Sequence, residues 1–178
     1  MRDARSLRLL LCAIELVLVA CGVTARREFL SPPSVASTHN GTQTVSVTIS
    51  GDTENPGQTS AMARIRRDDL RVAIGAVLVQ TRVFGAVVED GTADYRLDVG
   101  AYWCQTAGFY TVTMVLGGPW KLTRVRDGTV VLDDFVRGEG RKTGGDAFNG
   151  GTRVQLAIEA AARDFIAHGI GRLGEVAR

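Results

Sequence analysis

The side chains that most often carry out catalysis are few in this sequence, and their spacing does not fit a reaction centre. The two histidines, His39 and His168, have no partner at the spacing of metal ligands. Asp133 and Asp134 could bind a cation or share a proton, but neighbours on a strand point to opposite faces. The nucleophile elbow G-x-S-x-G does not occur. We therefore expect no catalytic residue, no metal site and no cofactor.

The glycine-rich stretch 138–151 contains Arg141 and Lys142 and suggests a phosphate-binding loop. The glycine that such a loop needs directly before its lysine is missing, and a dinucleotide-binding fingerprint fails at its third glycine. This stretch is therefore expected to be a mobile connection between the last strand and the last helix.

The start of the chain has the organisation of an export signal. Arg2, Arg5 and Arg8 form a positive region, and an apolar run over residues 9–20 follows. A membrane-spanning helix needs ~20 apolar residues, so this shorter run does not predict a permanent transmembrane anchor. The run ends in small residues directly before Cys21.

The stretch Leu18-Val19-Ala20-Cys21 resembles the lipobox of bacterial lipoproteins. The resemblance implies that the Cys21 thiol receives a diacylglyceryl group, that the chain is cut before Cys21, and that the new amino terminus is acylated with a chain such as palmitate. Gly22, in place of the aspartate typical of inner-membrane retention, favours the outer membrane, with the protein facing the periplasm. Asp3 and Glu15 depart from an ideal signal. The alternative is a buried amino-terminal helix with Cys21 as a core thiol.

Three segments follow from this organisation: a signal peptide over residues 1–20, a flexible tether over 21–43, and one periplasmic domain over 44–178. The domain is of a common size for a single core. The formal net charge is +2 and the basic residues are dispersed, so no nucleic-acid partner is expected. Without Cys21, Cys104 has no disulfide partner in the mature chain and is either a core residue or a reactive thiol.

Hydrophobic periodicity predicts the elements of the domain. Alternation predicts strands over 44–50 and 95–103, then strands over 109–116 and 120–126 separated by a break at Gly117-Gly118-Pro119. Helical spacing predicts helices over Asp68–Arg82 and Thr152–His168, the second starting with a capping box formed by Thr152 and Gln155. The apolar stripe expected on the first helix consists of Leu70, Ile74, Val77 and Leu78. The fold class is α+β: an antiparallel sheet of about four or five strands with two helices packed on one face.

Asp127-Gly128 predicts a two-residue hairpin turn of type I′, which requires positive φ at both residues. In that register Trp120 faces Phe135, and Lys121 faces Asp134 as an oppositely charged pair.

The order strand, helix, Asp94-Tyr95-Arg96-Leu97 strand, meander and closing helix resembles the auxiliary lipoproteins of envelope machines, such as those of ABC-type lipid transporters. The resemblance implies a non-catalytic, lipid-anchored accessory protein. It would dock on an envelope transport or assembly complex at the periplasmic face of the outer membrane. A small lipid-binding carrier is the alternative, and an enzyme is the least favoured. The aromatic residues that could line a groove for an acyl chain or peptide, or could simply be core, are Tyr102, Trp103, Tyr110 and Trp120.

Overall fold

The computed structural model of the chain describes residues 23–32, 41–51, 63–89, 91–107 and 110–176. Six strands of this part form the main sheet, in the order β4-β2-β5-β7-β6 with β8 on the other edge of β7, and β1 pairs with β3 in a separate small sheet. In chain order the elements are β1 (Val23–Thr24), the 3-10 helix η1 (Arg27–Phe29), β2 (Thr44–Ser50), β3 (Ala63–Arg64), α2 (Arg67–Gln80), β4 (Ala86–Val87), β5 (Tyr95–Gly100), β6 (Tyr102–Ala107), β7 (Thr111–Arg124), β8 (Val130–Thr143) and α3 (Gly150–Val176).

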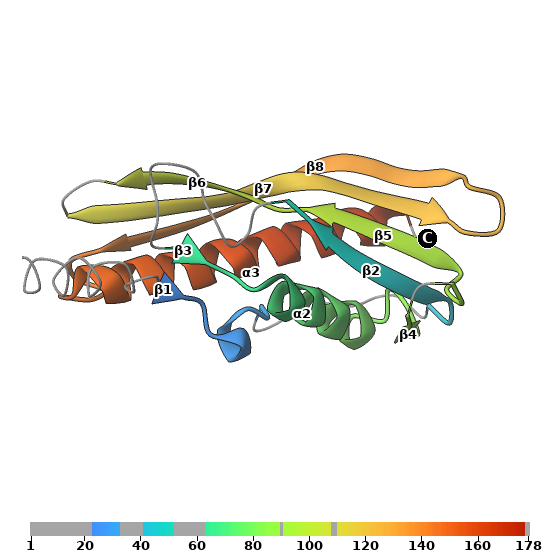
Figure 1. Cartoon of the computed structure of the whole chain (residues 1–178), viewed down its shortest axis with the longest axis horizontal. Coiled ribbons are helices and arrows are strands. Elements are labelled where there is room, and N and C mark those ends of the chain that lie inside the picture. The colour runs from blue at the N-terminus through green and yellow to red at the C-terminus, as the bar shows by residue number, and fades with distance from the viewer. Residues whose placement is uncertain (1–22, 33–40, 52–62, 90, 108–109, 177–178) are drawn as a thin grey trace, which may run out of the picture.

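The main sheet is mixed, because a helix rather than a tight turn joins its first two long strands. β2 leads through α2 to β4 and β5, and both of these strands pair with β2 in parallel. Hydrogen bonds from the Thr44 amide (2.8 Å) and hydroxyl (2.9 Å) to the Asp94 carboxylate join the starts of β2 and β5, and they lower the pKa of Asp94. The expected α+β class with two helices on one face is confirmed, and the expectation of a wholly antiparallel sheet is wrong (Figure 1).

α2 buries the stripe that the helical spacing predicted. It ends at Gln80, two residues before the expected Arg82, because Thr81 caps it and Arg82 adopts a left-handed conformation with φ of 55°. The Thr81 hydroxyl donates to the Val77 carbonyl oxygen over 2.7 Å. The side chains of the stripe that are 0–1% exposed are Leu70, Ile74, Val77 and Leu78.

β5 and β6 pair with the same edge of β7. A single antiparallel register runs from Tyr95 opposite Arg124 to Ala107 opposite Val112. β7 itself continues through Gly117-Gly118-Pro119, where we expected a break. The positions opposite Gly118 and Pro119 drop out of the β5–β6 ladder, so the missing proline amide falls where this ladder is already interrupted.

The turn between β7 and β8 is not of the predicted type. Gly128 has φ of 70°, but Asp127 does not have the positive φ that a type I′ turn requires. The Gly128 amide donates to the Arg124 carbonyl oxygen (2.9 Å), which closes a wider turn. The Thr129 amide donates to the Asp127 carboxylate (3.1 Å) and lowers the pKa of Asp127 to about 2.

The wider turn, with a bulge at Leu122/Thr123, moves the hairpin register by one residue. Trp120 stands opposite Asp134, not opposite Phe135 as predicted. A slip of one residue exchanges the two faces of a strand. Trp120 therefore points into the core while Phe135 points away from it, and this difference creates the surface described in the next subsection.

The glycine-rich end of β8 packs against α3 and is not the mobile connection that we expected. β8 continues to Thr143. A Cβ atom on Gly138 would lie 2.6 Å from the Cα of Phe165, and one on Gly140 would lie 2.6 Å from the amide nitrogen of Ala161. Because these distances are shorter than any real Cβ contact, the helix backbone approaches the strand only where side chains are missing. The alternating glycines thus position α3 on the sheet.

α3 starts at a different cap from the one expected. The Asn149 side chain accepts hydrogen bonds from the amides of Gly151 (2.8 Å) and Thr152 (3.4 Å). Asn149 therefore has the capping role that the sequence assigned to Thr152 and Gln155.

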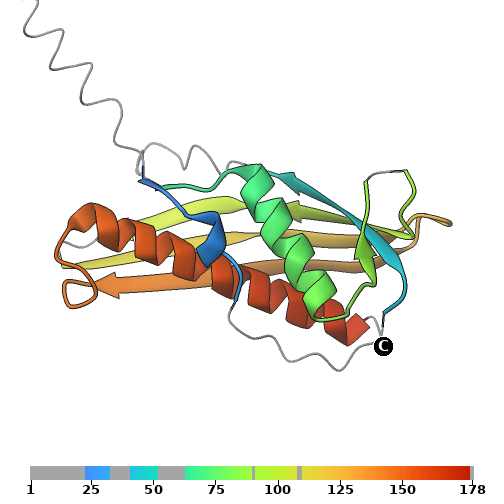
Figure 2. The same cartoon turned by 90° about the horizontal axis from the view of Figure 1, so that it is seen from below.

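α3 also continues beyond His168, its expected end, through Val176. The glycines that suggested fraying are helical, and Gly169 lies against the ring of Trp120. Ile170 and Leu173 are 1% and 0% exposed, so burial against the sheet stabilises the last turns. Figure 2 shows α2 and α3 lying across the same face of the sheet.

Part of the expected tether belongs to the folded domain. Ala25 and Leu30 are buried, and β1 pairs with β3 in parallel. The side chain of Glu159 in α3 is 2% exposed, and its carboxylate lies 3.3 Å from the Arg26 guanidinium. The prediction of a tether is wrong over residues 23–32, because contacts with α3 order a segment that has no periodicity of its own.

Candidate functional site

The face of the main sheet that lies away from the helices contains the candidate site. α2, α3 and the β1–β3 pair are all on the opposite face (Figures 1 and 2). Tyr102, Pro119 and Phe135 come together in the middle of this open face, and we call them the outer-face cluster. Tyr102 is 52% exposed and Phe135 is 68% exposed. In the part of the chain that the structure describes, no other element covers these rings.

Two glycines form the floor beneath the outer-face cluster. A Cβ atom on Gly117 would lie 3.3 Å from Cε1 and Cζ of Phe135. A Cβ atom on Gly100 would lie 2.6 Å from Cδ of Pro119 and 3.3 Å from Cε2 of Tyr102. The rings therefore lie directly on the backbone of rigid strands. Aromatic side chains held in this way offer contact area at a low cost in conformational entropy.

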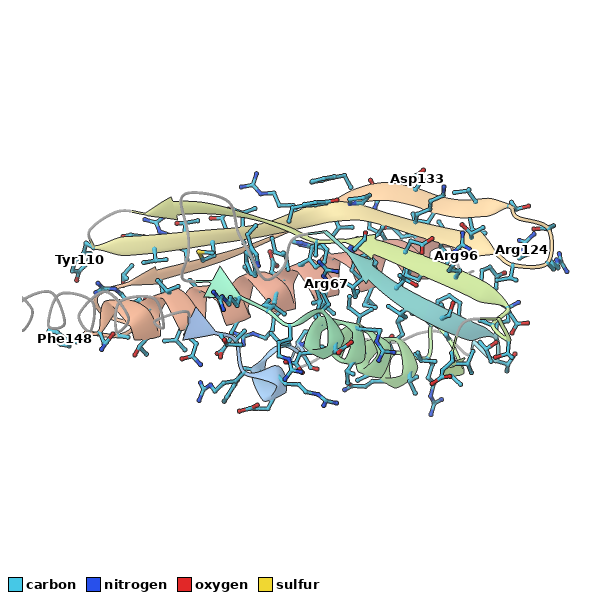
Figure 3. The ribbon with its side chains drawn as sticks, in the orientation of Figure 1. Arg67, Arg96, Tyr110, Arg124, Asp133 and Phe148 are labelled. Atoms are coloured by element: carbon cyan, nitrogen blue, oxygen red, sulfur yellow. The ribbon has the colours of Figure 1, made fainter. Side chains whose placement is uncertain are left out.

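Charged side chains of both signs surround the cluster. Arg96 and Asp98 form an ion pair of 3.0 Å, and Lys121 stands opposite Asp98 on one neighbouring strand and opposite Asp133 on the other. Figure 3 shows Asp133 on the side of β8 that faces away from α3. An apolar centre with a polar rim of mixed sign is the anatomy of a protein–protein interface. The full rim consists of Arg96, Asp98, Lys121, Asp133, Arg137 and Glu139.

Asp133 and Asp134 point to opposite faces of the sheet, as the strand geometry predicted. Asp133 is exposed on the outer face, whereas Asp134 faces α3, where its carboxylate accepts a hydrogen bond of 2.6 Å from Arg172. This bond lowers the pKa of Asp134. Asp133 is therefore a charge on the rim of the outer-face cluster, and Asp134 links β8 to α3. The two carboxylates do not form a shared site.

The four aromatic residues named from the sequence do not form one groove. Trp120 is fully buried and packs edge-on against Phe165, with ring centroids 5.4 Å apart. Tyr102 belongs to the outer-face cluster, and Tyr110 is 65% exposed at one end of the sheet. Trp103 is half-buried in β6.

Three other residues named in the sequence analysis are His168, Cys21 and Cys104. His168 is an exposed contact on α3, with Nδ1 2.9 Å from the carbonyl oxygen of Arg137. Cys21 and the side chain of Cys104 lie outside the described residues, so both expectations remain predictions.

The sequence pattern did not indicate that Phe135 is a surface residue, because the predicted register placed it opposite the buried Trp120. A signal was present for Tyr102. It follows Arg96, Asp98 and Gly100 at the alternate positions of the polar face, so an aromatic ring there interrupts the pattern. A large aromatic residue on the polar face of a strand indicates contact with something outside the domain core.

The described surface has two prominent hollows, and both are open and partly polar. The larger, about 430 Å³, lies beside β2 and the first turn of α2 and includes Arg67, Asp68 and Arg71 in its lining (Figure 3 labels Arg67). The smaller, about 360 Å³, lies beside the β7–β8 hairpin and includes Arg124. A site for an acyl chain is enclosed and mostly apolar. Neither hollow has that character.

Within the described ranges, no three His, Cys, Asp or Glu side chains come together as ligands for a metal ion. None of the helices described there has the length and apolar composition needed to cross a membrane.

No family model matches the sequence, and a search of curated proteins finds no relative. Among solved structures, the chain resembles the protein XCC0632 from Xanthomonas campestris, a DUF330 protein, with a TM-score of 0.62. The two are 16% identical, over 86% of this chain and 94% of that protein. The chain also resembles the hypothetical protein CT253 from Chlamydia trachomatis, with a TM-score of 0.58 and 6% identity over 77% of this chain and 98% of that one. These likenesses show the fold.

A weaker likeness, with a TM-score of 0.49, is to a minor lipoprotein from Acinetobacter baumannii. The two are 14% identical, over 75% of this chain and 93% of that protein.

Proposed function

We propose that this chain is a non-catalytic accessory protein, anchored to the bacterial outer membrane by lipid on Cys21, that docks on a protein of an envelope transport or assembly complex. The outer-face cluster is the observation that supports docking. It combines exposed aromatic rings, a rigid glycine floor and a rim of both charge signs, which together fit a protein partner better than a nucleic acid or a small ligand.

The position of the cluster is compatible with an anchored protein. β1, which begins two residues after Cys21, lies on the helix side of the main sheet (Figure 1). The outer-face cluster lies on the other side. Anchoring through Cys21 would therefore leave the cluster accessible to a partner in the periplasm.

Photocrosslinking in cells tests the docking surface. A photoreactive phenylalanine analogue at Phe135 of the full chain should give one dominant adduct with another protein. The same analogue at Val79, 43% exposed on α2, is the matched control and should not give this adduct. Equal adducts from both positions would contradict the proposal. An adduct between two copies of this chain would replace the envelope partner with self-association.

Truncation of the same ring gives a quantitative test. Phe135→Ala should change the free energy of unfolding by less than about 0.5 kcal/mol, because the side chain is on the surface. Buried aromatic side chains at the centre of an interface contribute about 2 kcal/mol or more, so binding to the crosslinked partner should weaken by roughly 30-fold. A variant that binds as well as the parent would exclude the cluster as the docking site.

Mass spectrometry of the membrane-extracted protein tests the anchor. The chain should begin at an acylated Cys21, and Cys21→Ser should release a folded domain from the membrane. An intact amino terminus at Met1 on most molecules, or a Cys21→Ser variant that stays membrane-bound, would refute this part of the proposal.

A further inference from the structure

One end of the molecule carries two exposed aromatic side chains, which we call the aromatic tip. Tyr110 comes directly before β7 and Phe148 comes shortly before α3. Because Thr111 pairs with Thr143, both residues stand at the same end of the β7–β8 ladder. Tyr110 is 65% exposed and Phe148 is 101% exposed. Figure 3 shows both at the end of the molecule where α3 begins.

The turn that carries Phe148 is held by hydrogen bonds. The amide and the hydroxyl of Thr143 both donate to the Asp146 carboxylate, over 2.8 and 3.0 Å, and Asn149 caps α3 directly after Phe148. The ring is therefore presented by an ordered loop. Two exposed rings at one ordered tip form a surface suited to an apolar environment outside the chain.

The amino-terminal segment runs along α3 toward this tip. Arg163 donates to the carbonyl oxygen of Phe29 over 2.7 Å, and earlier in the chain Arg26 pairs with Glu159 over 3.3 Å. The two contacts are four residues apart on α3, which is about 6 Å along the helix axis. The chain before η1 therefore lies nearer to the start of α3 than η1 does. Figure 1 shows β1 and the start of α3 at the same end of the molecule.

Cys21 precedes β1 by only two residues, which span at most about 7 Å. Any lipid on Cys21 would therefore enter the membrane close to the aromatic tip. The short connection would keep this end of the domain near the bilayer.

The charge around the tip fits a lipid surface. Residues 141–153 contain three basic side chains and one carboxylate. Lys142 pairs with Asp146 over 3.3 Å, Arg141 is exposed, and Arg153 donates to the carbonyl oxygen of Ala147. Aromatic rings flanked by basic side chains match the interfacial region of a bilayer with anionic head groups.

We infer that the aromatic tip is a membrane foot: Tyr110 and Phe148 insert into the interfacial layer of the bilayer that holds the acyl chains, and the neighbouring basic side chains contact lipid phosphates. This inference rests on the proposed anchor at Cys21. It also sets how far the outer-face cluster stands from the bilayer. Phe135 lies eight residues along β8 from Thr143, which places the outer-face cluster up to about 27 Å from the tip.

Tryptophan fluorescence with brominated lipids tests the foot. Phe148→Trp and the matched control Phe135→Trp each replace an exposed phenylalanine by a ring of similar chemistry. Both are made in the full chain, extracted from membranes and reconstituted in vesicles of phosphatidylethanolamine and phosphatidylglycerol. Trp103 and Trp120 also fluoresce, and their contribution is measured on the parent protein and subtracted. The added emission of Phe148→Trp should shift to the blue and be quenched several-fold more by acyl-chain bromine than that of Phe135→Trp.

Flotation of the same vesicles separates the two proposals. Protein that floats, with equal quenching in both variants or none in Phe148→Trp, refutes the foot and leaves the anchor intact. Protein that does not float refutes the anchor and with it the foot. Strong quenching in Phe148→Trp alone supports both.

Discussion

Gly169→Ala should destabilise the protein even though it removes a glycine from the interior of a helix. In α3 a change from glycine to alanine gains ~1 kcal/mol in helix propensity. At Gly169, however, the added Cβ would lie 2.5 Å from Cε2 of Trp120 and would overlap Cζ2 and Cη2 of the same ring. Trp120 is fully buried and packs on Phe165, so its ring cannot move aside without disturbing the core.

The size of the effect follows from a comparison with Gly171→Ala in the same helix. A Cβ on Gly171 would meet nothing within 4 Å, so this substitution should stabilise the protein by up to ~1 kcal/mol. The propensity gain is common to both variants and cancels in their difference. Overpacking costs ~1–3 kcal/mol, and three atoms of an immobile ring place Gly169→Ala at the upper end of this range. We expect it to lie ~2 kcal/mol below the parent.

Urea and thermal unfolding followed by circular dichroism measure both variants. For a domain of this size, 1 kcal/mol corresponds to about 2–4 °C in Tm. A Gly169→Ala variant as stable as the parent, or as stable as Gly171→Ala, would show that the core yields at Trp120. A double-mutant cycle sharpens the test. Trp120→Phe removes most of the overlapping atoms, so Gly169→Ala should cost less in that background, and simple additivity would refute the assigned contact.

Three further predictions concern other parts of the fold. Ile74→Ala should lower the free energy of unfolding by ~2–5 kcal/mol, because the side chain is fully buried; a loss below 1 kcal/mol in urea unfolding would point to a cavity beside α2. Gly128→Val should cost ~1–3 kcal/mol through its φ of 70° alone, since nothing lies within 4 Å, and Gly128→Asn should recover most of the loss in the same melt. Hydrogen bonding lowers the pKa of Asp127 from 3.8 to about 2. The stability that this carboxylate contributes is therefore complete above about pH 4 and is lost as the pH falls toward 2, so Asp127→Asn should flatten the acid limb of a plot of Tm against pH.

Local periodicity in the sequence was enough to identify some of the elements, β2 and α2 most clearly. The alternation over 44–50 and the stripe of Leu70, Ile74, Val77 and Leu78 predicted β2 and the buried face of α2, because each depends only on side-chain spacing within one element. The organisation before Cys21 likewise depends on adjacent residues, and it predicts export and lipid attachment from the sequence alone.

The order of the elements in the sequence also indicates which strands are parallel, and this indication was not used. A strand followed by a helix and another strand predicts a parallel pair, and β2 and β5 form one. The alternation of apolar residues was used to place strands but not to decide their direction, so the sheet was expected to be antiparallel throughout.

Only the tertiary structure decided what the glycines, the amino-terminal segment and the exposed aromatic rings do. Gly138 and Gly140 looked like a loop because a missing side chain leaves no periodic signal, yet they are required where α3 approaches β8. Residues 23–32 have no period and are ordered by Glu159 and Arg163, more than 130 positions later. The outer-face cluster arises from a register shift of one residue at a turn. The shift is set by the wider turn and the bulge between β7 and β8, and side-chain spacing within one strand determines neither of them.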